Sequence, residues 1–270
     1  MMRFAALQMI ARSGDLDANL AAIRDAAAAT AADGASLLVA PELATTGYGA
    51  GDRIRDLADA PDGRQVAGLA SIAAQHGVTV VAGFAERAGD AVYNSAALVR
   101  PDGRRAIYRK CHLYGPYERE LFQPGDKAPE IIDFDGVKVG LLICYDVEFP
   151  ESVRHLASAG ADLVVVPTAL PDSEHAAFIA GKILPVRAFE NQVAVIYANH
   201  AGSDGRFTYA GRSCIAVPDG SLAAQAPADR AALIVADYEP GDFAQCRLEN
   251  PYLADLRSAL FRPDPLPVQG

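Results

Sequence analysis

One cysteine in the chain lies where a nucleophile is favoured. Cys144 ends the apolar run VGLLIC and is followed by a turn into a helix that we expect to begin near Pro150. A thiol between a strand end and a helix N-terminus lies beside unpaired N–H donors and the positive end of the helix dipole, which favours the thiolate. Simple packing is the alternative, because cysteine is one of the most buried residue types. Its position ranks Cys144 above Cys111, Cys214 and Cys246 as a nucleophile.

A cysteine nucleophile needs a base, and histidine is the usual one. Of the five histidines, only His112 and His200 are not readily explained as surface or capping residues, and neither has an evident Asp or Asn partner. A carboxylate can serve instead if a dry pocket raises its pKa towards about 6 or 7. Glu42 is the candidate, because it follows the apolar run 36–40 and Pro41, at the kind of strand end where α/β sheets build their sites. A solvated loop glutamate is the alternative.

Lysine is rare in this chain, which has four lysines against twenty arginines. Lys110 follows an expected strand, and its compact ammonium group could stabilise an oxyanion or donate a proton, which a guanidinium group does not do. A lysine at the end of a strand is, however, more often a surface residue. Lys110 is therefore a candidate only in combination with Cys144 and Glu42.

Two further patterns are weaker. The glycine-rich run 47–51 lacks the Lys-Ser/Thr that follows a phosphate-binding loop, so we expect a flexible lid or turn there. The carboxylates Asp146, Glu148 and Glu151 could bind a hard metal ion, although charge and capping at a helix N-terminus explain them better. We assign no metal or phosphate site to either pattern.

A layered α/β scaffold has to bring these residues together. Short apolar runs alternate with helical patterns along the chain, and Pro-Asp-Gly turns at 101–103 and 218–220 predict hairpins. The polar segment 111–127 shows no period and is expected to be a functional loop. We expect strands at 3–9, 36–40, 78–85, 93–99, 106–109, 131–134, 138–143, 163–166 and 193–198, and helices at 15–32, 64–76, from 150, and at 176–190.

Composition excludes several classes of protein. The chain has 270 residues, of which 51% are hydrophobic, so it can bury a large core. A net charge of −10 has the wrong sign for binding nucleic acid or an anionic membrane. Neither a secretory signal nor a membrane-spanning run is evident, so we expect a cytoplasmic protein with reduced thiols. The spacing of the four cysteines fits neither a disulfide framework nor a zinc site, and we expect no cofactor.

Three motifs together resemble the Glu-Lys-Cys triad of the nitrilase superfamily of carbon-nitrogen hydrolases. Glu42, YRKCHLYG around Lys110 and GLLICYDVEFPE around Cys144 occur in that family's order and spacing. The resemblance also includes VVPTA at 165–169 and YANH at 197–200. It implies a single domain over the whole chain, with the family's fold, a four-layer α-β-β-α sandwich.

The same resemblance implies roles for residues and a quaternary structure. Cys144 would attack the substrate, Glu42 would take its proton, and Lys110 with the backbone N–H of Tyr145 would hold the oxyanion. Glu118 would orient lysine and substrate, with Glu120 as the competing candidate. The positions that resemble the family's substrate contacts are Tyr48, Tyr145, Ala169 and Leu170. The chain would form a homodimer or a higher homo-oligomer, and the tail from about residue 241 would pack at the interface.

The motifs resemble aliphatic amidases most, and among these the 5-aminopentanamidases. We therefore expect hydrolysis of a short linear amide to a carboxylate and ammonia through a cysteine thioester. The segment 170–182 departs from the aminopentanamidase pattern, although Asp172 and Glu174 within it could hold an ω-amino group. An N-carbamoyl amine or amino acid hydrolase is the alternative, a nitrilase fits less well, and a non-catalytic dimeric scaffold is the most distant possibility.

Overall fold

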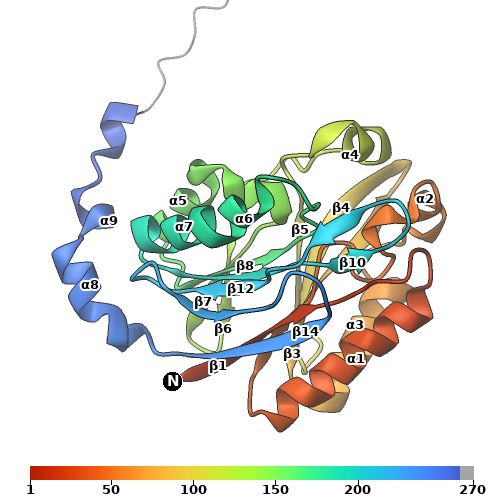
Figure 1. Cartoon of the computed structure of the whole chain (residues 1–270), viewed down its shortest axis with the longest axis horizontal. Coiled ribbons are helices and arrows are strands. Elements are labelled where there is room, and N and C mark those ends of the chain that lie inside the picture. The colour runs from red at the N-terminus through yellow and green to blue at the C-terminus, as the bar shows by residue number, and fades with distance from the viewer. Residues whose placement is uncertain (262–270) are drawn as a thin grey trace, which may run out of the picture.

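Two six-stranded β-sheets stack face to face at the centre of the computed structural model, which describes residues 1–261 (Figure 1). Helices α1 (Leu16–Ala32) and α3 (Arg64–His76) cover the outer side of one sheet. Helices α5 (Pro150–Ser158) and α7 (Leu184–Asn191) cover the outer side of the other. The predicted four-layer α-β-β-α sandwich is confirmed.

The first sheet has the strand order β14-β1-β2-β3-β4-β5. Strands β1, β2 and β3 are parallel, and β4, β5 and β14 join them in antiparallel pairs. The bounds of its strands are β1 Met2–Gln8, β2 Leu37–Val39, β3 Thr79–Ala88, β4 Ala91–Val99, β5 Arg105–Arg109 and β14 Ala232–Tyr238. The hairpin predicted across 101–103 is the β4–β5 pair.

The second sheet has the order β13-β12-β9-β8-β7-β6, with β7, β8 and β9 parallel. The bounds of its strands are β6 Ile131–Phe134, β7 Val137–Leu141, β8 Leu163–Pro167, β9 Ala194–Ala198, β12 Cys214–Ala216 and β13 Leu222–Gln225. A separate two-stranded hairpin consists of β10 (Ala201–Ser203) and β11 (Thr208–Ala210). The short helices are α2 Arg53–Leu57, α4 Gly115–Leu121, α6 Ala176–Phe178, α8 Ala244–Glu249 and α9 Tyr252–Asp255.

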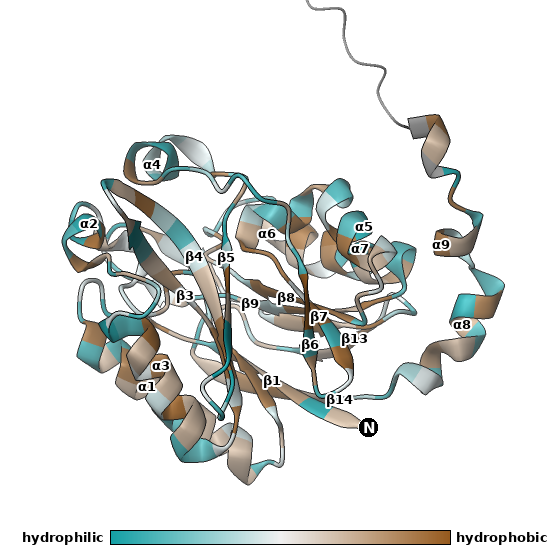
Figure 2. Cartoon of the chain, turned by 180° about the vertical axis from the view of Figure 1, so that it is seen from behind, coloured by the Kyte–Doolittle hydropathy of each residue, from teal (hydrophilic) through white to brown (hydrophobic). Residues whose placement is uncertain are grey.

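Local sequence explains where the outer helices of the first sheet begin and end. The Asp15 side chain accepts a hydrogen bond of 3.0 Å from the N–H of Ala18 and so caps α1. Gly77 adopts a left-handed conformation, with φ +66°, and ends α3. Figure 2 shows that the strands between the layers are largely hydrophobic, whereas α1 carries hydrophilic residues as well.

Strand β2 shows why a continuous apolar run is needed at the centre. Leu37 and Val39 pack in the core between the two sheets, whereas Leu38 packs with Ile23 and Leu69 under the helices. Both faces of the strand are therefore buried, as expected for a parallel strand between layers. The strand is followed by Pro41 and Glu42, so packing of the core fixes the backbone that leads to the Glu42 side chain.

Two local predictions were wrong, and a third is settled between its alternatives. The segment 111–127 is not all loop, because it contains α4, whose first turn holds Pro116, a residue that needs no backbone partner there. The helix expected at 176–190 is interrupted by a π-helical turn, Ile179–Ile183, just before Pro185. Proline cannot donate the regular helical hydrogen bond, and a wider turn accommodates it. Of the lid or turn predicted for the run 47–51, the structure shows a turn, the largely buried 3₁₀ turn Tyr48–Ala50.

The C-terminal segment runs along the outside of the sandwich after β14, where Tyr252 packs edge to face against Phe189 of α7. Helices α8 and α9 stand away from both sheets in Figures 1 and 2. Leu248 in this arm is 75% exposed, so an apolar side chain faces outwards there. The predicted interface tail from about 241 is described as far as residue 261, and its last part, 262–270, lies outside the described residues. Within residues 1–261, no helix is both long and apolar enough to cross a membrane.

Candidate active site

Both sheets contribute candidate residues, most of them within three residues of the end of a strand. Glu42 follows β2 and Lys110 follows β5 in the first sheet, whereas Cys144 and Ala169 follow β7 and β8 in the second. Glu118 lies on α4. The carboxyl ends of parallel strands thus supply the base, the nucleophile and a backbone donor, in agreement with the general placement of sites in α/β proteins.

Lys110 lies between two carboxylates. Its Nζ is 2.7 Å from Glu42 Oε1 and 2.7 Å from Glu118 Oε1, and all three side chains are buried. Burial alone would lower the pKa of Lys110, but the carboxylates of Glu118 and Glu42 outweigh it and raise the pKa well above its ordinary value. The lysine is therefore a fixed cation. Glu120, the competing candidate for Glu118, is exposed.

Glu118 is held by two donors besides the lysine. The hydroxyl of Tyr48 donates to Oε1 at 2.9 Å, and the backbone N–H of Tyr114 donates to Oε2 at 2.8 Å. A buried carboxylate that accepts several such bonds is fixed in one orientation. Glu118 is thus suited to hold Lys110 in place.

Glu42 has one engaged oxygen and one free oxygen. Oε1 accepts from Lys110 Nζ and, at 2.6 Å, from Asn94 Nδ2, whereas Oε2 is buried with no hydrogen-bond partner in the described part of the chain. Burial raises the pKa of Glu42 to about 7, against the lowering effect of Lys110 and with a further contribution from Glu118. A carboxylate with a free oxygen and a pKa near 7 has the properties of a general base.

The backbone around Glu42 is also fixed. His200 Nε2 donates to the carbonyl oxygen of Glu42 at 2.7 Å, and burial lowers the pKa of His200 to about 4, so its ring is neutral. Gly83 on β3 packs against the same segment so closely that a Cβ atom there would lie 2.6 Å from Glu42 Cα. Neither residue was assigned a role from the sequence, although His200 was one of the two unexplained histidines.

Cys144 occupies a strained position. Its φ of +46° is unusual for a residue with a side chain, and it begins the 3₁₀ turn Cys144–Glu148, which precedes α5. Burial and the Glu42 carboxylate raise the pKa of the thiol well above its usual range, although Lys110 and the backbone N–H of Ala169 act in the opposite direction. The expected thiolate is therefore wrong, because burial and the Glu42 carboxylate raise the thiol pKa more than Lys110 and Ala169 lower it. The nucleophile rests as a thiol.

Asp146 connects the lysine segment to the cysteine turn. Its Oδ1 accepts from the backbone N–H of His112 at 2.9 Å and lies 2.7 Å from His112 Nδ1, and its Oδ2 accepts from the Tyr108 hydroxyl at 3.0 Å. The acidic partner of His112 that the sequence does not make evident is thus Asp146, 34 residues away. In the described residues, no group of three or more His, Cys, Asp or Glu side chains could hold a metal ion.

The four residues expected to contact substrate differ in how far they are buried. Tyr48 and Leu170 are buried, and the N–H of Leu170 donates to Asn199 Oδ1 at 2.8 Å. The N–H of Ala169 faces the Cys144 sulfur, as its effect on the thiol pKa indicates. Tyr145 is half-buried directly after the cysteine.

The carboxylates proposed to hold an ω-amino group lie on the surface. Asp172 and Glu174 are exposed, and Glu174 pairs with its neighbour His175, at 3.4 Å. They have not been brought into the buried network around Lys110.

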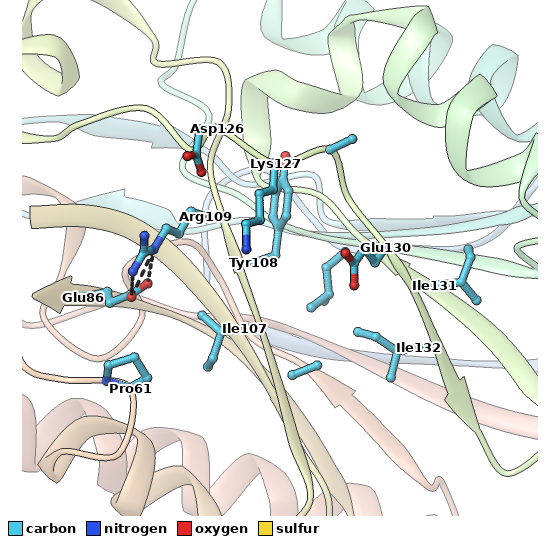
Figure 3. A pocket seen from close by; sticks show the side chains of 13 residues that line it. Pro61, Glu86, Ile107, Tyr108, Arg109, Asp126, Lys127, Glu130, Ile131 and Ile132 are labelled. Atoms are coloured by element: carbon cyan, nitrogen blue, oxygen red, sulfur yellow. Dashed lines mark hydrogen bonds and ion pairs between the residues drawn. The ribbon is translucent and has the colours of Figure 1, made fainter. Parts of the chain in front are cut away.

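A cavity of about 450 Å³ lies at the edges of the two sheets, between β5 and β6 (Figure 3). Glu86 and Arg109, joined by hydrogen bonds of 3.0 Å through Arg109 Nε, line one end of it. Its lining includes none of the four candidate catalytic residues. The cavity is therefore separate from the buried group around Cys144, which is only 6% exposed.

Comparison with known proteins agrees with this geometry. The family model described as Carbon-nitrogen hydrolase matches residues 3–248. The hydrolase in the pqqF 5′ region of Pseudomonas protegens is 40% identical over 96% of this chain and 90% of its own length. An (R)-stereoselective amidase of Pseudomonas sp. is 35% identical over 96% of this chain and 93% of its own length.

A solved structure is similar over nearly the same range. It is a Glu-to-Gln variant of the amidase of Nesterenkonia sp. AN1, in which acrylamide has added to the active-site cysteine. It matches with a TM-score of 0.85 at 35% identity and covers 96% of this chain and 98% of that chain. The family match, these relatives and the shared fold show that the chain belongs to the carbon-nitrogen hydrolase family, the nitrilase superfamily, and that it is a hydrolase of carbon–nitrogen bonds related to amidases.

Proposed function

We propose that the enzyme hydrolyses short linear aliphatic amides to a carboxylate and ammonia through a thioester on Cys144. The observation that carries this proposal is the arrangement around Glu42. One of its oxygens is held by the Lys110 cation. The other is buried and has no hydrogen-bond partner among the described residues, and the Glu42 carboxylate is close enough to Cys144 to raise the pKa of the thiol. Base, nucleophile and cation thus form one buried unit.

In acylation, Glu42 Oε2 takes the thiol proton as the Cys144 sulfur attacks the amide carbon. Because the thiol pKa is raised, proton transfer and attack occur together rather than from a resting thiolate. The carbonyl oxygen becomes an oxyanion held by Lys110 Nζ and the backbone N–H of Tyr145, and one such donor is worth about 3 kcal/mol. Protonated Glu42 then gives its proton to the nitrogen, the C–N bond breaks, and ammonia leaves.

In deacylation, a water molecule attacks the thioester and Glu42 takes one of its protons. The C–S bond of the second tetrahedral intermediate breaks, the proton returns to the Cys144 sulfur, and the carboxylic acid leaves. The same carboxylate alternates between base and acid, which requires a pKa close to the working pH. Lys110 keeps its charge in both steps, because its two carboxylate partners stabilise the ammonium form.

The size of the acyl group is inferred from the closed surroundings of the site. Cys144 is almost inaccessible, and buried Tyr48 and Leu170 occupy expected substrate positions, which favours a small acyl group. Structures of a relative support this choice, since acrylamide and the acetamide moiety of fluoroacetamide have added covalently to the active-site cysteine in Glu-to-Gln and Glu-to-Leu variants of the Nesterenkonia amidase. Exposed Asp172 and Glu174 offer no buried partner for an ω-amino group, so we propose an uncharged amide as the preferred substrate.

Ammonia release from a matched panel tests the proposal. The panel contains propionamide, 5-aminopentanamide, propionitrile and N-carbamoylputrescine, with the Cys144→Ala variant as the blank. We expect the fastest release from propionamide and none from the variant. Fastest release from the carbamoyl compound, accompanied by carbon dioxide, would assign the enzyme to the carbamoyl hydrolases. Unchanged release by the variant would exclude the cysteine mechanism.

A further inference from the structure

The β10–β11 hairpin, residues 201–210, packs against the turn that carries Tyr48. Phe207 and Tyr209 of the hairpin lie 5.4 Å and 6.3 Å from the Tyr48 ring, measured between ring centroids, and both pairs meet edge to face. Tyr117 of α4 completes the cluster at 5.4 Å from Tyr48. The Tyr48 ring is thus enclosed by aromatic side chains from two other parts of the chain.

Asp204 joins the hairpin to this turn by hydrogen bonds. Its Oδ2 accepts from the backbone N–H of Gly49 at 2.9 Å and also from the hydroxyl of Tyr209. The fit is close, because a Cβ atom at residue 49 would lie 2.1 Å from Asp204 Oδ2. The residue after Tyr48 is therefore fixed by a carboxylate 155 residues further along the chain.

The turn that carries Tyr48 also fixes Glu118, the residue that holds Lys110. The Tyr48 hydroxyl donates to Glu118 Oε1 at 2.9 Å, and the same oxygen accepts from Lys110 Nζ at 2.7 Å. A displacement of the turn would remove one of the donors on Glu118 and change the position of the lysine. Contacts thus continue without interruption from Asp204 through Tyr48 and Glu118 to Lys110.

We propose that Asp204 is a positioning residue for Lys110, acting through the Tyr48 turn and Glu118. This inference rests on the proposed amidase function, because it assigns Lys110 to the oxyanion. Loss of the Asp204 carboxylate weakens the hold on the Gly49 N–H, and the Tyr48 hydroxyl then leaves Glu118 for part of the time. The oxyanion loses stabilisation, while Glu42 keeps the hydrogen bond from Asn94 to its side chain and the one from His200 to its backbone.

Asp204 also stabilises its own hairpin, since Oδ1 accepts from the backbone N–H groups of Arg206 and Phe207 at 3.0 Å and 2.9 Å. A test has to separate this structural role from positioning. Two reagents for Cys144 do so. Chloroacetamide has a carbonyl oxygen for Lys110, and its alkylation of the thiol releases chloride without hydrolysing an amide. Methyl methanethiosulfonate has no such carbonyl, and its labelling rate reports access to the thiol and removal of the thiol proton.

The experiment compares Asp204→Ala, Tyr48→Phe, the double variant and the control Ser203→Ala. Ser203 bonds within the hairpin, to the carbonyl of Phe207 at 2.9 Å, and lies outside the proposed connection. For each single change at 204 and 48 we expect kcat on propionamide, and the rate of Cys144 labelling by chloroacetamide, to fall by about tenfold. The double variant should be no slower than the slower single variant. Methanethiosulfonate labelling, and all rates of the control, should stay unchanged.

Two results would overturn the inference. Equal changes with both reagents would show that Asp204 only supports the hairpin, and additive losses in the double variant would show that it acts independently of Tyr48. Failure of the proposed function would look different. The wild-type enzyme would then release no ammonia from any amide, and the labelling rates would still report whether Asp204 acts through Tyr48.

Discussion

Replacing Gly83 by alanine should displace the general base Glu42 without removing any catalytic side chain. A Cβ atom at this position would lie 2.2 Å from the backbone nitrogen of Leu43 and 2.6 Å from Glu42 Cα. Ordinary contact begins at 3.4 Å, so the Leu43 nitrogen would have to retreat by about 1.2 Å, the difference between 3.4 Å and 2.2 Å. Backbone atoms cannot give way as the end of a flexible side chain can, so Glu42 has to move with them.

This displacement is large compared with the contacts of Glu42. A shift of about 1 Å breaks alignment with Lys110 and with the thiol, and misplacement of that size can cost about 10²-fold in rate. A hundredfold loss in kcat/KM corresponds to about 2.7 kcal/mol of transition-state stabilisation. Overpacking should also lower the free energy of unfolding by about 1–3 kcal/mol.

Steady-state kinetics and urea unfolding measure the two effects separately. Gly181→Ala is the matched control, because a Cβ atom at Gly181 would have no neighbour within 4 Å and the backbone is not in a left-handed conformation. We expect a loss of activity at position 83 and none at 181. Wild-type activity and stability in Gly83→Ala would refute the claim that close packing against β3 places Glu42.

Three further predictions follow from charges and contacts. Glu42 acts as a base in its ionised form, and its pKa is raised to about 7. The value of kcat/KM should therefore be constant above pH 7 and fall as the pH decreases through 7. A profile that falls only near pH 4 would contradict the raised pKa. Lys110→Met leaves Glu42 and Glu118 buried without their cation and should destabilise the fold by about 3–5 kcal/mol in urea, whereas exposed Lys127→Met should not. For the predicted homodimer, sedimentation velocity should show an assembly for the full chain and a monomer for a chain that ends at Glu239; an assembly that survives the truncation would remove the C-terminal arm from the interface.

The sequence predicts the strands and outer helices of the layers well, because each depends on the pattern of apolar and capping residues within its own segment. Continuous apolar runs predict strands buried on both faces. Asp15 begins α1 by side-chain capping, and Gly77 ends α3 through its left-handed backbone conformation. Helix α4 was missed because it has only seven residues and begins with Gly-Pro. A helix of seven residues has too few turns to show a helical repeat of apolar residues, so the polar composition of the segment led to the prediction of a loop.

The candidate site could be predicted only in part. Residue types single out Glu42, Lys110 and Cys144, but only the fold brings residues of both sheets together. Asn94 and His200 contact Glu42 from 52 and 158 residues away and leave no local signal. The expected thiolate was wrong for a related reason. The helix dipole can be read from the neighbouring residues, whereas desolvation depends on everything that packs around the sulfur.

The central claim is that Cys144 alone forms the covalent bond to substrate, with Glu42 taking its proton. Peptide mass spectrometry of the enzyme after reaction with chloroacetamide near pH 7 tests it most directly, because Cys111, Cys214 and Cys246 serve as internal controls in the same chain. We predict labelling of the Cys144 peptide far ahead of the other three, and a strong reduction of that labelling in Glu42→Gln. Equal labelling of all four cysteines, or a rate that Glu42→Gln leaves unchanged, would contradict the account.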